Sequence, residues 1–208
     1  MMAMWKRTMA AAAAVLAAAP FVLAQGSPPA EAPTDVPPAS APPVADEQRP
    51  ATLDDLYAEL AAATDAQAAM LIDLAISERL DAAGGPTAQL LSQRALVTAE
   101  GGNFALALEL ADAAVAFAPR YAEGFSTRAT IHALKEDYGA AMADLQQALV
   151  IEPRHYRALA NAGAILESSG DDARALEAYD KALALYPLYE EVRTAADALR
   201  KKIEGDRI

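Results

Sequence analysis

Apolar and small residues recur at helical spacing along most of the chain after residue 50, and this spacing predicts helices. In residues 66–82, Ala69, Ile72, Ile76 and Leu80 fall on one face of a helix. Alanine, the best helix former and a poor strand former, accounts for 55 of the 208 residues. The pattern therefore predicts an all-α fold of about nine helices without a sheet.

A repeat of 33 or 34 residues organises this helical region, and its junctions are marked by Pro86, Pro119, Pro153 and Pro187. Small residues recur in phase with these prolines, at Ala95, Ala129 and Gly163, at Ala107, Ala141 and Ala175, and at Ala114, Ala148 and Ala182. Small side chains let two helices approach closely. Each repeat is therefore expected to be a hairpin of two helices. The expected N-caps of the second helices are Asn103, Asp137 and Asp171.

The repeats resemble the tetratricopeptide repeat (TPR) family. The best match runs from Leu159-x2-Ala162-Gly163-x2-Leu166 through Ala175-x3-Tyr179 to Pro187. The resemblance covers residues 88–189 and implies a right-handed α-solenoid of stacked hairpins, with units at 88–121, 122–155 and 156–189. Residues 51–87 lack the repeat pattern and are predicted to form a degenerate helical pair or a cap. Residues 190–205 are predicted to form a polar capping helix.

The first 50 residues have the pattern of a secretory signal followed by a linker. Lys6 and Arg7 precede an Ala-rich apolar run that ends in small residues, so residues 1–24 are predicted to be removed before Gln25. The alternative is an uncleaved inner-membrane anchor, for which the run is short. Residues 25–50 are rich in proline and are predicted to be a disordered linker. We expect an exported bacterial protein of the periplasm that is not inserted in the membrane after cleavage.

The chain offers little material for catalysis, metal binding or a cofactor. It has no cysteine, and its two histidines, His132 and His155, lie too far apart in sequence for a metal-ligand motif. We interpret His132 as a packed, hydrogen-bonded core residue and His155 as an exposed junction residue. The formal net charge of −12 disfavours nucleic acid as a partner. These features predict a protein that is not an enzyme and uses no cofactor.

In the TPR family, the first helix of each hairpin lines a concave groove that accepts a segment of another protein. Mapped onto this chain, the groove consists of Gln89, Ser92, Gln93, Leu96, Glu123, Ser126, Thr127, Thr130, Arg157, Ala160, Asn161 and Ala164. These side chains are small and mostly neutral. The resemblance implies a non-catalytic adaptor of the cell envelope that binds a partner polypeptide. The alternative is a structural subunit that assembles with itself or within a larger secretion or envelope-biogenesis complex.

Two charge patterns add to this picture. Residues 51–85 carry seven acidic residues and one base, whereas Arg154-His155-Tyr156-Arg157 is a locally basic patch. The patch is either ordinary junction surface or a receiver of an acidic segment, from a partner or from residues 51–85 of another copy. In the second repeat, Arg128 and Asp144 are expected to face each other across the hairpin and to form a partly buried ion pair.

Overall fold

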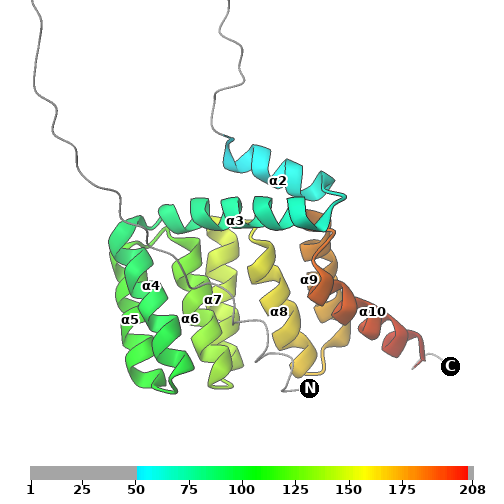
Figure 1. Ribbon diagram of the computed structural model, residues 1–208. Helices are drawn as coiled ribbons and strands as arrows, with labels where there is room; N and C mark the ends of the chain where they lie inside the picture. Colours follow the sequence, from blue (N-terminus) through cyan, green and yellow to red (C-terminus); the bar gives the residue numbers. More distant parts are fainter. Residues whose placement is uncertain (1–50, 206–208) are drawn as a thin grey trace, which may run out of the picture. The chain divides into compact units, whose positions relative to one another are not determined.

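The computed structural model describes residues 51–205, which contain helices and connecting turns but no strand (Figure 1). The nine helices in this range are α2 (Leu53–Ala62), α3 (Ala66–Ala82), α4 (Gly85–Glu100), α5 (Phe104–Phe117), α6 (Ala122–Leu134), α7 (Tyr138–Ile151), α8 (Tyr156–Ser168), α9 (Asp172–Leu185) and α10 (Glu190–Gly205). The predicted all-α solenoid is confirmed. None of these helices is long and apolar enough to cross a membrane. The predicted signal and linker, residues 1–24 and 25–50, lie outside the described residues.

Three hairpins form the body of the solenoid, in which α4 pairs with α5, α6 with α7, and α8 with α9 (Figure 1). The predicted N-caps of the second helices are confirmed. The side chains of Asn103, Asp137 and Asp171 each accept a hydrogen bond from the backbone N–H three residues further on. Such a bond satisfies an amide that has no partner within its own helix. The identity of the capping residue therefore determines where each second helix begins.

The turn inside each hairpin requires a left-handed backbone conformation one residue before the cap. The φ angle is +82° at Gly102, +63° at Glu136 and +79° at Gly170. Glycine adopts this conformation without steric cost because it has no Cβ, whereas other residues rarely do so. Two of the three turns are therefore relaxed, and the turn at Glu136 is strained.

Small residues pack where the helices of the solenoid approach one another. The alanines that recur in phase are fully buried: Ala107, Ala141, Ala175, Ala114, Ala148 and Ala182. Gly163 illustrates how close the contact is, because a Cβ added there would lie 2.6 Å from Cδ1 of Tyr179. A side chain at this position would have to displace the tyrosine ring, so the 34-residue pattern of small residues encodes the interhelical distance.

The first two helices of the described chain do not continue the row of parallel hairpins. Helix α3 runs across the row at the end where α6 and α8 begin, and α2 contacts α9 (Figure 1). Helix α3 turns its apolar stripe inward, and Ala69, Ile76 and Leu80 are buried. At its far end, the Tyr121 hydroxyl donates a 3.0 Å hydrogen bond to Asp81. The pair therefore lies along one edge of the solenoid.

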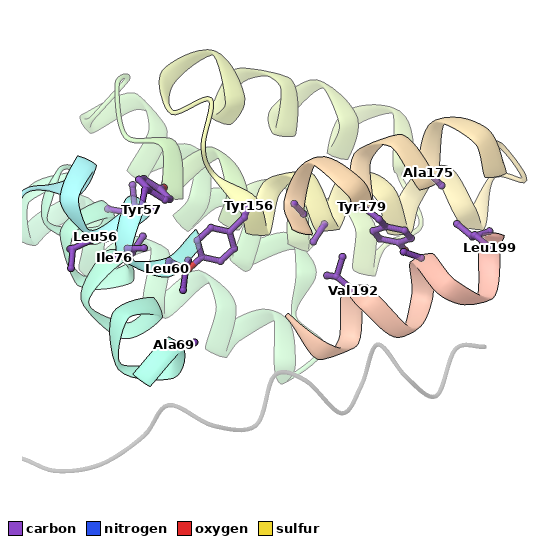
Figure 2. Packing of buried hydrophobic residues seen from close by; sticks show 14 residues of the cluster. Leu56, Tyr57, Leu60, Ala69, Ile76, Tyr156, Ala175, Tyr179, Val192 and Leu199 are labelled. Atoms are coloured by element: carbon purple, nitrogen blue, oxygen red, sulfur yellow. The ribbon is translucent and has the colours of Figure 1, made fainter. Parts of the chain in front are cut away.

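The largest cluster of buried apolar residues joins this N-terminal pair to the C-terminal part of the solenoid (Figure 2). Leu60 of α2 and Ile76 of α3 share this cluster with Tyr156 of α8 and Tyr179 of α9. Helix α10 adds Val192, Ala196 and Leu199 and packs against α9. The two ends of the described chain thus share one core.

Candidate functional site

The twelve predicted groove residues lie on α4, α6 and α8, and they differ widely in exposure. Four are buried and contribute to packing: Ser92, Ser126, Thr127 and Ala160. Seven are half-buried: Gln89, Leu96, Glu123, Thr130, Arg157, Asn161 and Ala164. One, Gln93, is exposed. The accessible side chains recur at 34-residue spacing, with Leu96, Thr130 and Ala164 at one repeat position and Gln93 and Asn161 at another.

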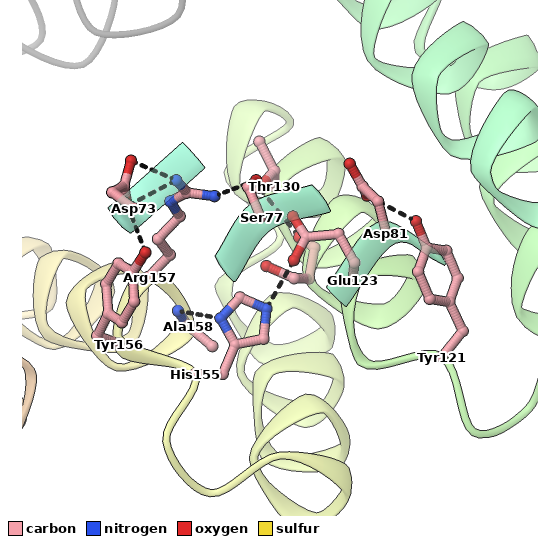
Figure 3. A network of polar contacts seen from close by, with 11 residues as sticks. Asp73, Ser77, Asp81, Tyr121, Glu123, Thr130, His155, Tyr156, Arg157 and Ala158 are labelled. Atoms are coloured by element: carbon pink, nitrogen blue, oxygen red, sulfur yellow. Dashed lines mark hydrogen bonds and ion pairs between the residues drawn. The ribbon is translucent and has the colours of Figure 1, made fainter. Parts of the chain in front are cut away.

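Side chains of α3 already bind Arg157, the groove residue with the strongest potential to bind an anion (Figure 3). The Arg157 Nη2 atom lies 2.8 Å from both carboxylate oxygens of Asp73, and its Nη1 donates to Ser77 at 2.7 Å. The Tyr156 hydroxyl also donates to Asp73. Burial and the neighbouring carboxylate both raise the pKa of the Tyr156 hydroxyl above its ordinary value. A guest chain would have to displace Asp73 to use Arg157.

Arg154, the other arginine of the basic patch, is also bound by the N-terminal pair of the same chain. Arg154 lies 2.7 Å from Asp54 of α2, and its guanidinium sits 4.5 Å from the centre of the Tyr57 ring. The acidic segment therefore docks on the patch within one molecule. Asp73 is the contact that the sequence analysis missed. Its signal was an acidic residue on the same helix face as Ala69 and Ile76, where a carboxylate requires a partner.

His155 is buried, so the prediction that it is an exposed junction residue is wrong. Its Nε2 lies 2.8 Å from Oε2 of Glu123, and the backbone N–H of Ala158 donates to its Nδ1 (Figure 3). Because Nδ1 accepts, the ring proton belongs on Nε2, where it is donated to the Glu123 carboxylate. The ring thereby caps α8 and ties it to α6. Its burial is explained by its position between the start of α8 and Glu123 of α6, which holds the ring inside the junction.

The titration of the two acids beside His155 is shifted in opposite directions. Burial by itself would raise the pKa of Glu123, but its interaction with His155, with a further contribution from Arg157, holds that pKa below the ordinary value. Burial, reinforced by the charge of Glu123, raises the pKa of Asp81. These shifts follow from how well each carboxylate is paired. Asp81 joins α3 to Tyr121, whereas Glu123 joins α6 to His155.

The second histidine also differs from its prediction. His132 is half-buried as expected of a packed residue, but its Nδ1 atom has no hydrogen-bond partner among the described residues. The nearest carboxylate, that of Asp137, lies 3.7 Å away, beyond hydrogen-bond distance. In the described range, no cluster of three or more His, Asp or Glu side chains is placed to hold a metal ion.

The predicted ion pair between Arg128 and Asp144 is confirmed. The Nε and Nη2 atoms of Arg128 lie 2.8 and 2.6 Å from the two oxygens of Asp144, in a bidentate arrangement. A third member, Asp112 of α5, was not predicted from the sequence and lies 2.7 Å from Nη1 of Arg128. The triad therefore joins the first and second hairpins as well as the two helices of the second.

Comparison with known proteins identifies the family of this chain. No protein-family model matches it. A TPR repeat-containing protein of Rhizobium etli is 33% identical over 155 residues, which are 74% of this chain and 76% of the relative. The TPR domain of Sgt2 from Aspergillus fumigatus has a similar structure, with 21% identity and a TM-score of 0.55 over 59% of this chain and 82% of that domain. The first TPR of Spaghetti (RPAP3), bound to the HSP90 peptide SRMEEVD, gives 16% identity and a TM-score of 0.54 over 57% and 94% of the two chains. This chain therefore belongs to the TPR repeat-containing proteins.

Proposed function

We propose that this protein is a non-catalytic adaptor of the bacterial cell envelope, and that it holds a segment of a partner protein on the concave face of its solenoid. The observation that carries the proposal is the repeated, accessible and uncharged surface formed by α4, α6 and α8. The structurally similar TPR of Spaghetti is bound to a peptide of another protein, which supports a peptide-binding role for this fold. The predicted signal supports the envelope as its location.

The accessible part of the groove is narrower than the sequence analysis expects. It consists of Gln93, Leu96, Thr130, Asn161 and Ala164. Of the other predicted groove residues, Ser92, Ser126, Thr127 and Ala160 are buried, Arg157 is engaged by α3, Glu123 is bound to His155, and Gln89 is half-buried near the start of α4. A guest chain would therefore lie along the part of the first helices that α3 leaves open.

The chemistry of this surface favours recognition of a peptide backbone over recognition of a charged terminus. Each of the amides of Gln93 and Asn161 offers both a donor and an acceptor, which match the N–H and C=O groups of an extended chain. The small side chains at Thr130 and Ala164 leave room for a guest to approach the helices. No lysine or arginine lies among these five residues, so a carboxylate would gain no ion pair there.

A bulky substitution tests the groove directly. We expect Ala164→Trp to abolish capture of the partner in crosslinked co-purification from intact cells, because an indole would fill the space that a guest requires. Ala143→Trp, at an exposed alanine on α7, is the matched control and should retain the same partner. Circular dichroism should show unchanged helix content in both variants. Undiminished capture by Ala164→Trp would refute binding in the groove.

The proposed location has its own test. We expect N-terminal sequencing of the protein from the periplasmic fraction to begin at or near Gln25. Protein that begins at Met1 or Met2 and sediments with membranes would instead indicate a retained anchor. Either result leaves the test of the groove valid, because the substituted residue lies far along the chain from the N-terminus.

A further inference from the structure

Helices α4 and α5 present an apolar face at the end of the solenoid. Leu90, Val97 and Leu106 are exposed there although their side chains are large and apolar. Together with Arg94, Thr98, Leu110 and Gln93 they line a hollow of about 480 Å³. Single exposed apolar residues are common on soluble proteins, but a group of this kind marks an interaction surface.

The other repeats of the chain reveal what this face would contact. Val97 occupies the same repeat position as Ile131 and Ile165. Ile131 is fully buried in one cluster with Ala107 and Ala111 of the preceding second helix, whereas Val97 is 67% exposed. The end face thus has the composition of an interface between hairpins, and no helix of the described chain covers it.

The charged residues of this face also indicate that a further helix should cover it. Arg94 occupies the repeat position of Arg128, which receives Asp144 from its own hairpin and Asp112 from the preceding second helix. In the first hairpin, Leu110 stands where Asp144 stands in the second. Among the described residues, no carboxylate lies within ion-pair distance of Arg94. A helix that covers this face should therefore bring both apolar side chains and a carboxylate.

Helix α3 has such a surface on its outer side. Met70, Leu71 and Leu74 are each more than half exposed. Glu78 follows one turn after Leu74 on the same helix face, is exposed, and has no ion-pair or hydrogen-bond partner within the described range. The inner side of α3 is already used against the solenoid, so this outer face is available to another molecule.

We propose that α3 of one copy docks on the α4–α5 face of a second copy, with Leu71 and Leu74 against Leu90 and Val97 and with Glu78 paired to Arg94. The α10 end of the solenoid does not compete for this role, because its exposed side chains include the charged residues Asp197 and Lys201. The two docking surfaces differ, so the contact is heterologous. It closes into a dimer when it forms twice about a two-fold axis, and it otherwise extends into a chain of molecules.

Light scattering on the purified chain tests this proposal, and the reference is the monomer mass, which is 21.7 kDa for the full 208 residues. We expect the wild type to associate in a concentration-dependent way. Arg94→Glu and Glu78→Arg should each weaken association at least about tenfold, because each places like charges in contact. The double variant Arg94→Glu/Glu78→Arg should restore it. Val150→Asp, at an exposed apolar residue of α7, is the control and should associate like the wild type.

The results of these experiments distinguish a second copy of the chain from other occupants of the α4–α5 face. A wild-type chain that is monomeric at every concentration overturns the proposal, and crosslinks from residues 1–50 to α4 within one molecule would then identify the occupant. Association that is unchanged in Arg94→Glu also overturns it, as does a double variant that is not rescued. Circular dichroism of each variant establishes that the hairpins remain folded. The groove and this interface share Gln93, but Ala164 does not line the hollow, so Ala164→Trp should leave association unchanged while it tests the groove.

Discussion

The triad of Arg128, Asp144 and Asp112 allows a quantitative test of how this solenoid is stabilised. The Asp144 side chain is 8% exposed and that of Arg128 22%, whereas that of Asp112 is 63% exposed. Arg128→Ala leaves Asp144 as a nearly buried carboxylate without its cation, and removal of one partner of a buried pair costs about 3–5 kcal/mol. Asp144→Ala leaves a guanidinium that still contacts Asp112 and solvent, so we expect about 2 kcal/mol. Asp112→Ala should cost less than about 1 kcal/mol.

The third hairpin provides the reference for removing both charges. Ala162 and Ala178 occupy the positions that Arg128 and Asp144 have in the second hairpin. A solenoid interface therefore tolerates two alanines here. The double variant Arg128→Ala/Asp144→Ala should accordingly be destabilised by less than the sum of the two single variants, because no buried charge is left without a partner.

Urea denaturation followed by circular dichroism measures these differences. The midpoint and the slope should both be compared, because repeat proteins can lose two-state behaviour when one unit is weakened. Lys181→Ala, which removes an exposed partner of Glu177, serves as the surface control and should change stability little. A loss of stability in Arg128→Ala no larger than in this control would show that the triad does not stabilise the solenoid. A loss in the double variant equal to the sum of the two single variants would show that Arg128 and Asp144 do not interact.

Three further substitutions test other parts of the fold. Gly163→Ala should cost about 1–3 kcal/mol in urea titrations because its Cβ would overlap the Tyr179 ring, whereas Gly101→Ala, whose Cβ meets only ordinary contacts, should be tolerated. Glu136→Gly should stabilise the chain by about 1 kcal/mol by relieving the left-handed backbone, and an unchanged midpoint would contradict this. Because the pKa of Glu123 is lowered in the folded chain, its ionised form stabilises the fold above its ordinary pKa of 4.5, and this contribution is lost as the pH falls through the folded-state value. The stability difference between the wild type and Glu123→Gln should therefore shrink on acidification below pH 4.5, and a difference that grows would refute the assignment.

The sequence by itself determined the repeating part of the molecule. The spacing of the prolines, the phased small residues and the caps at Asn103, Asp137 and Asp171 act over a few residues or within one hairpin, so a linear pattern is sufficient to encode them. The contact between Arg128 and Asp144 belongs to the same class. These two residues are 16 positions apart, and the geometry of one hairpin brings them together.

Only the tertiary structure decided where α2 and α3 lie and, with them, the state of the predicted site. Their sequence shows that they are helical and that one face is apolar, but no repeat position fixes what that face covers. The decisive contact joins Asp73 to Arg157 across 84 residues. This contact occupies Arg157 and so removes the one cation from the accessible groove. It also leaves the α4–α5 face uncovered within the described chain, because a helix held along the edge cannot also close the end.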